Sequence, residues 1–470
     1  MITARHDVHE AIRAALANDS LQRALNTHPL ERTARVRASL AQLPDAPDLR
    51  RRARQIKDYS LAHLDVLLEE LAERLEERGG RVHWARDAAE AVAIVEGVAR
   101  EHGCRRCIKT KSMTTEEIGL TAALQAGGVA TVETDLGEFI LQLAGDRPSH
   151  IITPMIHKTR QQAARLLAEK LGARHTEEPA ELVRIVRKNL REVFVKADMA
   201  VVGVNFAVAE TGSLVLLTNE GNGRWALARP RVLAAVMGME KVIARLTDLA
   251  ALLRLVVPSA VGSALTSYTS IVTGPRRAGE ADGPEHLHLV ILDNGRSAVL
   301  GGPYRELLRC VRCGACLNVC PVYRKVGGHA YGSVYPGPIG AALTPLLARG
   351  AGHTGQLREL SSLCGACLEA CPVLIDIPRL LIRQRGDRGA DGQGGWGFRW
   401  AMRAWGWWCG GRRRYRLAQQ LLGWLLGPAA RGGWVVRLPG ALGAWTRCRD
   451  LPLPARHPFR ELYRRMRGKR

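Results

Sequence analysis

One stretch of twelve residues constrains the fold and the chemistry of this chain more than any other. Cys310, Cys313, Cys316 and Cys320 are followed directly by Pro321, which gives the pattern C-x2-C-x2-C-x3-C-P. In bacterial-type ferredoxins with this spacing, three cysteines hold one cubane cluster and the fourth reaches a second cluster. The stretch therefore predicts an iron–sulfur centre.

A shorter copy of the pattern follows. Cys364, Cys367 and Cys371 precede a second Cys-Pro ending, and Ser361 stands where the first copy begins with a cysteine. Seven of the eleven cysteines fall in these two aligned copies. A structural zinc site is the alternative, but it usually pairs two C-x2-C knuckles into four ligands, and a 4+3 pattern fits that poorly.

The crossed arrangement of ferredoxin motifs assigns the cysteines to two clusters. Cys310, Cys313, Cys316 and Cys371 are expected to bind a first 4Fe–4S cluster, and Cys320, Cys364 and Cys367 a second cluster. The second cluster lacks one cysteine. Either a water, a serine or a partner's residue completes a 4Fe–4S cluster, or an open iron serves as a substrate site, or the cluster is 3Fe–4S.

The two motifs lie far apart in the chain. The 43 residues between Cys320 and Cys364 are too many for a compact two-cluster ferredoxin, and parts of them have helical character. We therefore expect a helical ferredoxin arrangement, like that of the iron–sulfur subunits of respiratory dehydrogenases.

The region before the cysteines alternates between strand-like and helix-like segments. This alternation predicts an α/β domain over residues 56–300, with a largely parallel sheet and helices on both faces. Strands are expected at 82–84, 108–112, 129–133, 150–155, 199–204 and 287–292. The other expected divisions are a helical N-terminal arm (1–55), a ferredoxin-type domain (301–385) and a basic, Trp-rich tail (386–470).

Polar residues gather where the expected strands end. In open α/β sheets, the crevice beyond the carboxyl ends of the strands is the usual ligand site, and these side chains suit an anionic ligand. The alternative is that they form turns and helix caps. No dinucleotide-binding or P-loop glycine pattern is present. The residues are Lys109, Lys111, Ser112, Glu133, Thr134, Asp135, Glu138, His157, Lys158, Asn205, Glu210, Thr211, Gly212, Asn219, Glu220, Asn222 and Arg224.

Cys104 and Cys107 form a separate C-x2-C pair. Two thiols do not complete a tetrahedral metal site. Neighbouring arginines would suit redox-active thiolates. We favour incidental thiols.

The net charge of +23 is concentrated in the tail. Residues 383–470 contain 20 Lys and Arg against 4 Asp and Glu, and eight of the ten tryptophans lie between Trp396 and Trp445. Such a segment suits docking to an anionic membrane surface or to a partner such as a respiratory-chain protein. The alternative is a helical appendage whose tryptophans pack on the main body. No RNA-binding motif accompanies the basic residues, so nucleic acid is not expected.

Two absences bear on localisation. The N-terminus has no apolar signal region, and no apolar run reaches the length of a membrane span. Together with the cluster thiolates, this predicts a protein of the reducing cytoplasm, with peripheral contact to the inner face of the membrane through the tail as an option.

Several motifs together resemble the lactate-utilisation iron–sulfur protein B family. The resemblance covers roughly residues 5–385 and extends to a Trp-rich tail. Beside the stretch 310–323, the motifs are KTKSM at 109–113, ETDLGE at 133–138, PSHIITP at 148–154, AETG at 209–212, TNEGN at 218–222, GGHAYG at 327–332 and YPGPIG at 335–340.

The resemblance carries expectations of its own. It implies an α/β fold similar to sugar-phosphate isomerases and CoA transferases. It also implies an electron-transfer role in a three-subunit system that oxidises L-lactate to pyruvate, with a cysteine-rich iron–sulfur protein and a shorter α/β protein as partners. The family's ligands correspond to the same seven cysteines, and its second motif also has three, so Ser361 is no departure.

An alternative function places the catalysis in this chain. In it, the α/β domain acts on an anionic small molecule through Glu210 and the lysines near Lys109, with the clusters as its redox partner. The sequence favours an electron-transfer subunit that is not catalytic alone.

Overall fold

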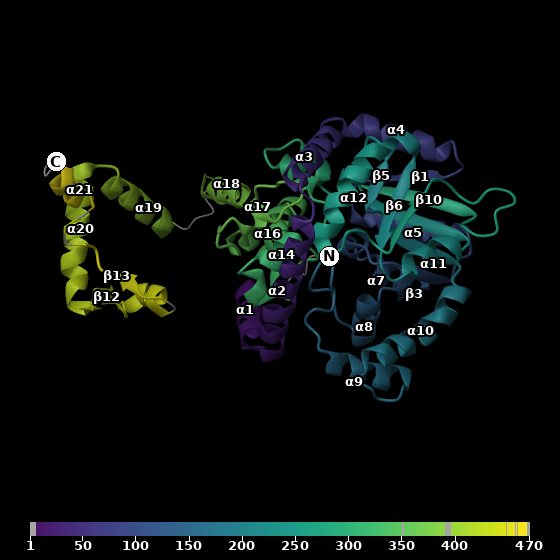
Figure 1. Ribbon diagram of the computed structural model, residues 1–470, viewed down its shortest axis with the longest axis horizontal. Helices are drawn as coiled ribbons and strands as arrows, with labels where there is room; N and C mark the ends of the chain where they lie inside the picture. The colour runs from purple at the N-terminus through teal and green to yellow at the C-terminus, as the bar shows by residue number, and fades with distance from the viewer. Residues whose placement is uncertain are drawn as a thin grey trace. The chain divides into compact units, whose positions relative to one another are not determined.

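The computed structural model describes residues 6–349, 352–390, 396–447, 449–455, 457 and 459–467. The chain forms two compact units, residues 1–385 and 386–470. Figure 1 labels their helices and strands.

A six-stranded parallel sheet forms the centre of the first unit, as the sequence predicts. Its strand order is β1-β10-β7-β4-β2-β3, and every neighbouring pair is parallel. The strands are β1 (Arg81–Ala85), β2 (Arg106–Lys109), β3 (Ala130–Glu133), β4 (Met199–Gly203), β7 (Val232–Gly238) and β10 (His286–Leu292).

The sequence interpretation fails at two strands. Residues 150–155 form turns, because His150 Nδ1 accepts hydrogen bonds from the backbone N–H groups of Ile152 and Thr153 and folds the chain back. The central strand β7 was not expected. Its residues are all buried, so they lack the polar alternation that marks a half-exposed strand.

Two apolar layers cover the sheet. Alternate residues of β7 point to opposite faces. Leu233 and Met237 join the core that contains α4 (Leu64–Glu76), while Val232 and Val236 join the core that contains α5 (Ala88–Glu101) and α7 (Leu120–Ala126). The predicted covering of both faces by helices is confirmed.

A second, mixed sheet was not expected from the sequence. It has the order β8-β5-β6-β9, and its residues Val208 and Val215 join a core shared with α12 (Leu246–Val261) and the cysteine-rich region. Its strands are β5 (Phe206–Val208), β6 (Ser213–Thr218), β8 (Val242–Ile243) and β9 (Tyr268–Val272).

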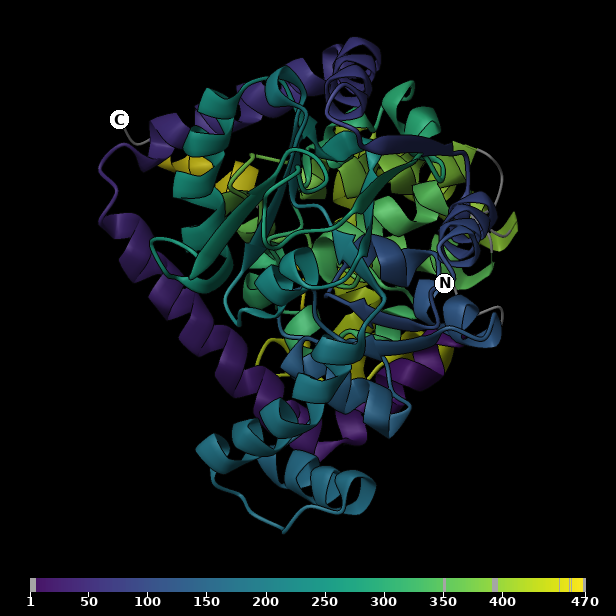
Figure 2. The ribbon, with the colours of Figure 1, turned by 90° about the vertical axis from the view of Figure 1, so that its right-hand side faces the viewer.

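The N-terminal helices pack on the cysteine-rich region. They are α1 (Val8–Ala17), α2 (Asp19–Ala41) and α3 (Ala46–Ala62), drawn in purple in Figure 2. Leu25 is fully buried, the Gln22 amide donates to the Lys325 carbonyl at 2.7 Å, and Arg50 Nη2 donates to the Cys371 carbonyl at 2.8 Å. The arm thereby holds both ends of that region.

The cysteine-rich region consists of short helices and turns, in agreement with the expected helical arrangement. Its elements are α13 (Arg296–Leu300), η3 (Arg305–Arg309), α14 (Ala315–Val319), α15 (Tyr323–Val326), η4 (His329–Tyr331), α16 (Gly337–Leu347), η5 (Gly352–Glu359), α17 (Ala366–Glu369) and α18 (Ile377–Ala390).

The remaining helices of the first unit surround the sheet. Three of them, α8 to α10, share a small apolar core of their own around Phe139, Leu167 and Leu190. The helices are α6 (Met113–Glu117), α8 (Leu136–Ala144), α9 (Arg160–Leu171), α10 (Pro179–Lys196) and α11 (Asn222–Ala228), and single 3₁₀ turns are η1 (Ala209–Thr211) and η2 (Met239–Lys241).

The second unit has little core. Among its described residues, only Val435 is fully buried, and seven tryptophans are about half exposed or more, Trp396 and Trp424 the most. Its elements are α19 (Trp396–Cys409), α20 (Arg412–Leu426), η6 (Gly427–Ala429), β11 (Ala430–Arg431), β12 (Trp434–Val435), η7 (Gly440–Arg447), β13 (Leu451–Pro452) and α21 (Phe459–Arg467). None of the described helices combines the length and apolar character that a membrane span requires.

Candidate metal centre and adjoining crevice

The structure gathers the motif cysteines into two groups. Cys310, Cys313, Cys316 and Cys371 line one cavity, although the last belongs to the second motif. Cys320 lies instead among the neighbours that raise the pKa of Cys367, together with Cys364. The two groups contain the same residues as the two expected ligand sets, and their binding of clusters stays a prediction.

The backbone repeats itself around the two motifs. Arg312 and Gly314, which flank Cys313, both have positive φ (61° and 72°), and Leu363 and Gly365, which flank Cys364, do too (57° and 86°). A left-handed conformation at a residue other than glycine is strained. The two cysteine loops therefore share the same backbone geometry.

The donor set of the first group fits a cubane cluster. Burial, and then the neighbouring thiols, raise the pKa of Cys316 well above its ordinary value. Thiols packed so closely ionise together only when a cation compensates their charge, and a coordinating metal deprotonates them. The Ile375 N–H donates to Cys371 Sγ at 3.3 Å, as backbone groups do around cluster sulfurs.

The second group lies nearer the surface. Cys364 is exposed, whereas Cys320 and Cys367 are buried, and the Tyr323 N–H donates to Cys320 Sγ at 3.4 Å. Ser361 Oγ accepts a hydrogen bond from the Leu363 N–H at 3.1 Å and so shapes the loop just before Cys364. This group therefore supplies three cysteine ligands.

A buried ion network joins the sheet to the first cysteine loop. Glu240, on η2 just after the central strand, accepts hydrogen bonds from Arg296 Nε at 2.7 Å and from Arg312 Nη2 at 3.3 Å. Arg296 Nη2 also donates to Glu117 at 2.8 Å. Burial alone would raise the pKa of Glu240, but the two guanidinium groups outweigh it and lower that pKa to about 2.

A crevice of about 260 Å³ opens at the carboxyl ends of the strands, next to this network. Its lining contains much of the polar set that the sequence places there: Lys111, Ser112, Asp135, Asn205, Asn219, Glu220 and Asn222. It also contains Lys241, Arg312 and Cys313. The crevice thus reaches the first cysteine group.

Sequence reasoning missed Lys241 and Arg312. Lys241 follows the unrecognised strand β7, so identification of that strand would have placed the lysine at the sheet edge. Arg312 lies between Cys310 and Cys313, and the cysteine motif predicts a role only for its cysteines.

Two residues of the alternative, catalytic interpretation lie elsewhere. Lys109 is fully buried, and its ammonium pairs with Glu116 at 2.9 Å, Glu133 at 3.0 Å and Glu138 at 3.9 Å. Glu210 accepts a hydrogen bond from the Leu246 N–H at the start of α12. Neither side chain lines the crevice, so the structure does not favour the catalytic alternative.

Further residues of the predicted set are placed away from the crevice. Gly212 packs against α4, where a Cβ on this glycine would lie 2.7 Å from Cβ of Arg74. The hydroxyl groups of Thr211 and Ser213 form a hydrogen bond with each other. Thr134 Oγ1 donates to the Lys109 carbonyl at 2.8 Å, and the Arg224 guanidinium lies 5.7 Å from the ring centre of Tyr268.

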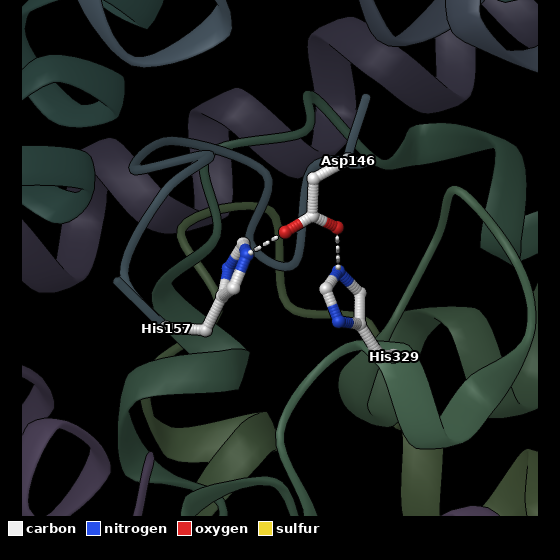
Figure 3. A group of neighbouring side chains, drawn as sticks. All are labelled: Asp146, His157 and His329. Atoms are coloured by element: carbon white, nitrogen blue, oxygen red, sulfur yellow. Dashed lines mark hydrogen bonds and ion pairs between the residues drawn. The ribbon is translucent and has the colours of Figure 1, made fainter. Parts of the chain in front are cut away.

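His157 and Lys158 belong to a separate polar group. Figure 3 shows Asp146 between His157, 3.0 Å away, and His329 of η4, 4.0 Å away. Lys158 Nζ lies 2.6 Å from the same carboxylate, and Ser149 Oγ is 2.7 Å from the other nitrogen of His157. Because His157 and His329 both lie beside Asp146, this group ties the α/β domain to the cysteine-rich region.

Cys104 and Cys107 have the character of incidental thiols. Both are buried, and burial raises the pKa of Cys107 to about 12. A thiol with a raised pKa is a poor nucleophile at neutral pH, so a redox role is not supported.

Three family models match successive parts of the chain. The LUD domain matches residues 68–292, the 4Fe-4S dicluster domain residues 306–392, and the C-terminal region of lactate utilisation protein B residues 384–468. Together they span the sheet domain, the cysteine-rich region and the tail.

Relatives named lactate utilization protein B match nearly the whole chain. The protein of Bacillus licheniformis is 42% identical over 97% of this chain and 95% of its own length. That of Bacillus velezensis is 43% identical over 92% and 91%, and that of Oceanobacillus iheyensis 43% identical over 96% and 94%. A crystal structure of a DUF162 family protein from Deinococcus radiodurans covers 49% of this chain and 98% of its own, with 12% identity and a TM-score of 0.27, too low to test the fold similarity.

Proposed function

This chain belongs to the lactate utilisation protein B family, and on that premise we propose that it is the iron–sulfur subunit that carries electrons during oxidation of L-lactate to pyruvate. The observation that supports this most is the pair of cysteine groups, each with the same left-handed loop, in one compact unit with the α/β domain. A similarity of that domain to sugar-phosphate isomerases and CoA transferases is part of the proposal.

Seven cysteines would hold the cofactors. Cys310, Cys313, Cys316 and Cys371 would bind a 4Fe–4S cluster, and Cys320, Cys364 and Cys367 a second cluster of the 4Fe–4S or 3Fe–4S type. When bound, the clusters supply one-electron transfer. The chain's own contribution is to leave Cys364 of the second group exposed, which gives a partner access to that end.

Metal analysis of the anaerobically purified chain tests this assignment. We expect about seven or eight iron atoms and about eight acid-labile sulfides per chain, with 4Fe–4S signals in low-temperature EPR. Cys313→Ala should lose roughly half of the iron, whereas Cys409→Ala, at an exposed cysteine outside both motifs, should keep all of it. Purified protein that holds only zinc, or no metal, would refute the proposal.

Growth links the metal to lactate. A strain that lacks this gene should fail to grow on L-lactate, and the wild-type gene or Cys409→Ala should restore growth, while Cys313→Ala should not. Growth restored by Cys313→Ala would show that the first cluster is not needed for lactate utilisation.

We also propose that the chain works with two further subunits on the cytoplasmic side of a membrane. Support for a membrane contact comes from the second unit, where exposed tryptophans alternate with arginines and Arg414 lies 4.5 Å from the ring centre of Trp407. Aromatic and cationic side chains together favour the interface of an anionic bilayer. The full chain should sediment with phosphatidylglycerol vesicles and not with phosphatidylcholine vesicles.

The tryptophans supply a matched control for that experiment. Trp407→Ala with Trp424→Ala should reduce sedimentation several-fold, whereas Trp84→Ala, which removes a half-exposed tryptophan of β1, should not. Equal losses in both variants, or no binding by the wild type, would point to a protein partner for the tail instead.

A further inference from the structure

The crevice at the sheet edge has the size of a small-molecule site. Its volume is about 260 Å³, just below the range of roughly 300–1,000 Å³ that holds drug-sized ligands. It therefore suits a molecule much smaller than a dinucleotide. It lies where the parallel strands end, which is the usual place for a ligand in such a sheet.

Two buried cationic groups of its lining have unused hydrogen-bonding capacity. The Lys241 side chain is only 7% exposed and makes no hydrogen bond or ion pair with any described residue. Arg312 is 8% exposed, and its Nη1 has no hydrogen-bond partner among the described residues. Burial of an ammonium group, or of a guanidinium nitrogen, without a hydrogen-bond partner costs free energy, so Lys241 and the Nη1 atom of Arg312 favour an anionic ligand beside them.

The crevice lining also offers acceptors. Asp135 and Glu220 belong to it, and each already accepts one or more backbone hydrogen bonds that hold it in place: Asp135 from Gly137 and Glu138, and Glu220 from Leu136. Burial raises the pKa of Glu220, so this carboxyl can also hold a proton. A ligand hydroxyl or keto oxygen would find a donor or an acceptor here.

An aliphatic wall completes the crevice. It is formed by α12 and includes Val256, Val257 and Ala260. A short hydrocarbon group would be desolvated against it. Cationic, carboxyl and aliphatic groups in one lining match the three parts of a small hydroxy or keto acid.

We propose that this crevice binds a small 2-hydroxy or 2-oxo carboxylate, with the ligand carboxylate held by Lys241 and Arg312. The choice of this acid class rests on the proposed function in lactate utilisation, whereas the anion site itself rests on the unpaired Lys241 ammonium and on the free Nη1 atom of Arg312. Neither of these residues is a cysteine ligand, and no family model or relative assigns the site.

The position of the site couples it to the first cysteine group. Cys313 lines the crevice, and Arg312 is its neighbour in the chain. The charge of Lys241 also interacts with Cys310. An anion that binds Lys241 and Arg312 compensates two positive charges beside the first group, so binding should lower the reduction potential of the cluster held there.

Titration calorimetry of the reconstituted full-length protein tests the site. L-lactate and pyruvate should bind at one site per chain, and inorganic phosphate more weakly. Lys241→Met should weaken binding of both acids at least tenfold, while Lys170→Met, at an exposed lysine of α9, should leave it unchanged. EPR-monitored redox titration should show that saturating pyruvate shifts the potential of one cluster downward in the wild type and not in Lys241→Met.

Each other outcome overturns the proposal. These outcomes are no binding of either acid, tighter binding of phosphate, unchanged affinity in Lys241→Met, or cluster potentials that pyruvate does not move. Should Lys241→Met lack its full iron content, Thr218→Val decides instead, because it removes a crevice hydroxyl that has no partner among the described residues and keeps the side-chain volume. An affinity within twofold of wild type would then overturn the proposal.

The same samples separate this inference from the function. Protein that is fully loaded with iron and sulfide but binds no acid overturns the crevice site and leaves the iron–sulfur role intact. Protein without clusters refutes the function itself.

Discussion

Removal of the charge of Glu240 should destabilise the first unit markedly. This carboxylate is 1% exposed and stands between Arg296, which is fully buried, and Arg312. Glu240→Gln keeps the shape of the side chain but leaves Arg312 with no carboxylate within 4 Å among the described residues. Breaking a buried pair from one side typically costs about 3–5 kcal/mol, since the remaining charge stays desolvated.

The pKa of Glu240 gives a similar magnitude. Lowering it from 4.5 to about 2 corresponds to about 3 kcal/mol in favour of the ionised form. With roughly 2.1 cal/mol/K of unfolding entropy per residue, residues 1–385 have an unfolding entropy of about 0.8 kcal/mol/K. The variant should therefore melt about 4–6 °C below the wild type.

Scanning calorimetry of the cluster-loaded protein under nitrogen measures this difference. A carboxylate with a lowered pKa contributes its full stability above its unfolded pKa of about 4.5, so the gap should be the same at pH 6 and pH 7. Glu169→Gln, at an exposed position on α9, should change the melting temperature by less than about 1 °C. Glu240→Gln melting within 1 °C of the wild type would refute the assigned role of the network.

Three further predictions concern the fold. Gly328→Ala should lower the melting temperature by several degrees, because a Cβ on Gly328 would lie 1.8 Å from the Ser149 carbonyl oxygen. Gly355→Ala should not lower it, since a Cβ there would meet nothing within 4 Å. Equal melting temperatures of the two variants would contradict this packing. His150 is buried with its pKa lowered to about 3, so below pH 6.5 the unfolded chain binds the proton before the folded chain does, and stability should fall by about 1 kcal/mol between pH 6.5 and 5.5. His150→Gln should flatten that part of the pH profile of the melting temperature, and an unchanged slope would argue against it. Lys109→Met should unfold at a urea concentration well below that of the wild type, because three close carboxyl groups lose the ammonium group that pairs with them. A midpoint similar to that of the wild type would mean that these carboxyl groups share protons instead.

The sequence was most informative where spacing is tied to chemistry. The cysteine motifs predict which thiols lie together, because four ligands of one cluster must converge whatever the chain does between them. Strand–helix alternation likewise predicts the parallel sheet, although β7 escaped because an all-buried strand has no polar period to detect. The second sheet was missed because β5 and β8 are very short and because β6 pairs with β9, which lies much later in the chain.

The crevice shows a different limit. Lys109 is the last residue of β2, and Lys111 lies two residues beyond it, so the sequence places both at one strand end. In the structure Lys111 lines the crevice, whereas Lys109 is enclosed by three glutamates from elsewhere in the fold. Which polar side chain stays available depends on tertiary partners, and a single sequence does not reveal them.

The crossed grouping of the cysteines has a consequence for how the protein is made. Cys310 leaves the ribosome well before Cys371, with the helices of the intervening region still to be synthesised. Neither group is complete until the second motif has emerged and folded back against the first. Cofactor insertion is therefore expected to follow synthesis of the cysteine-rich region, and a chain truncated before Cys364 should accumulate without either centre.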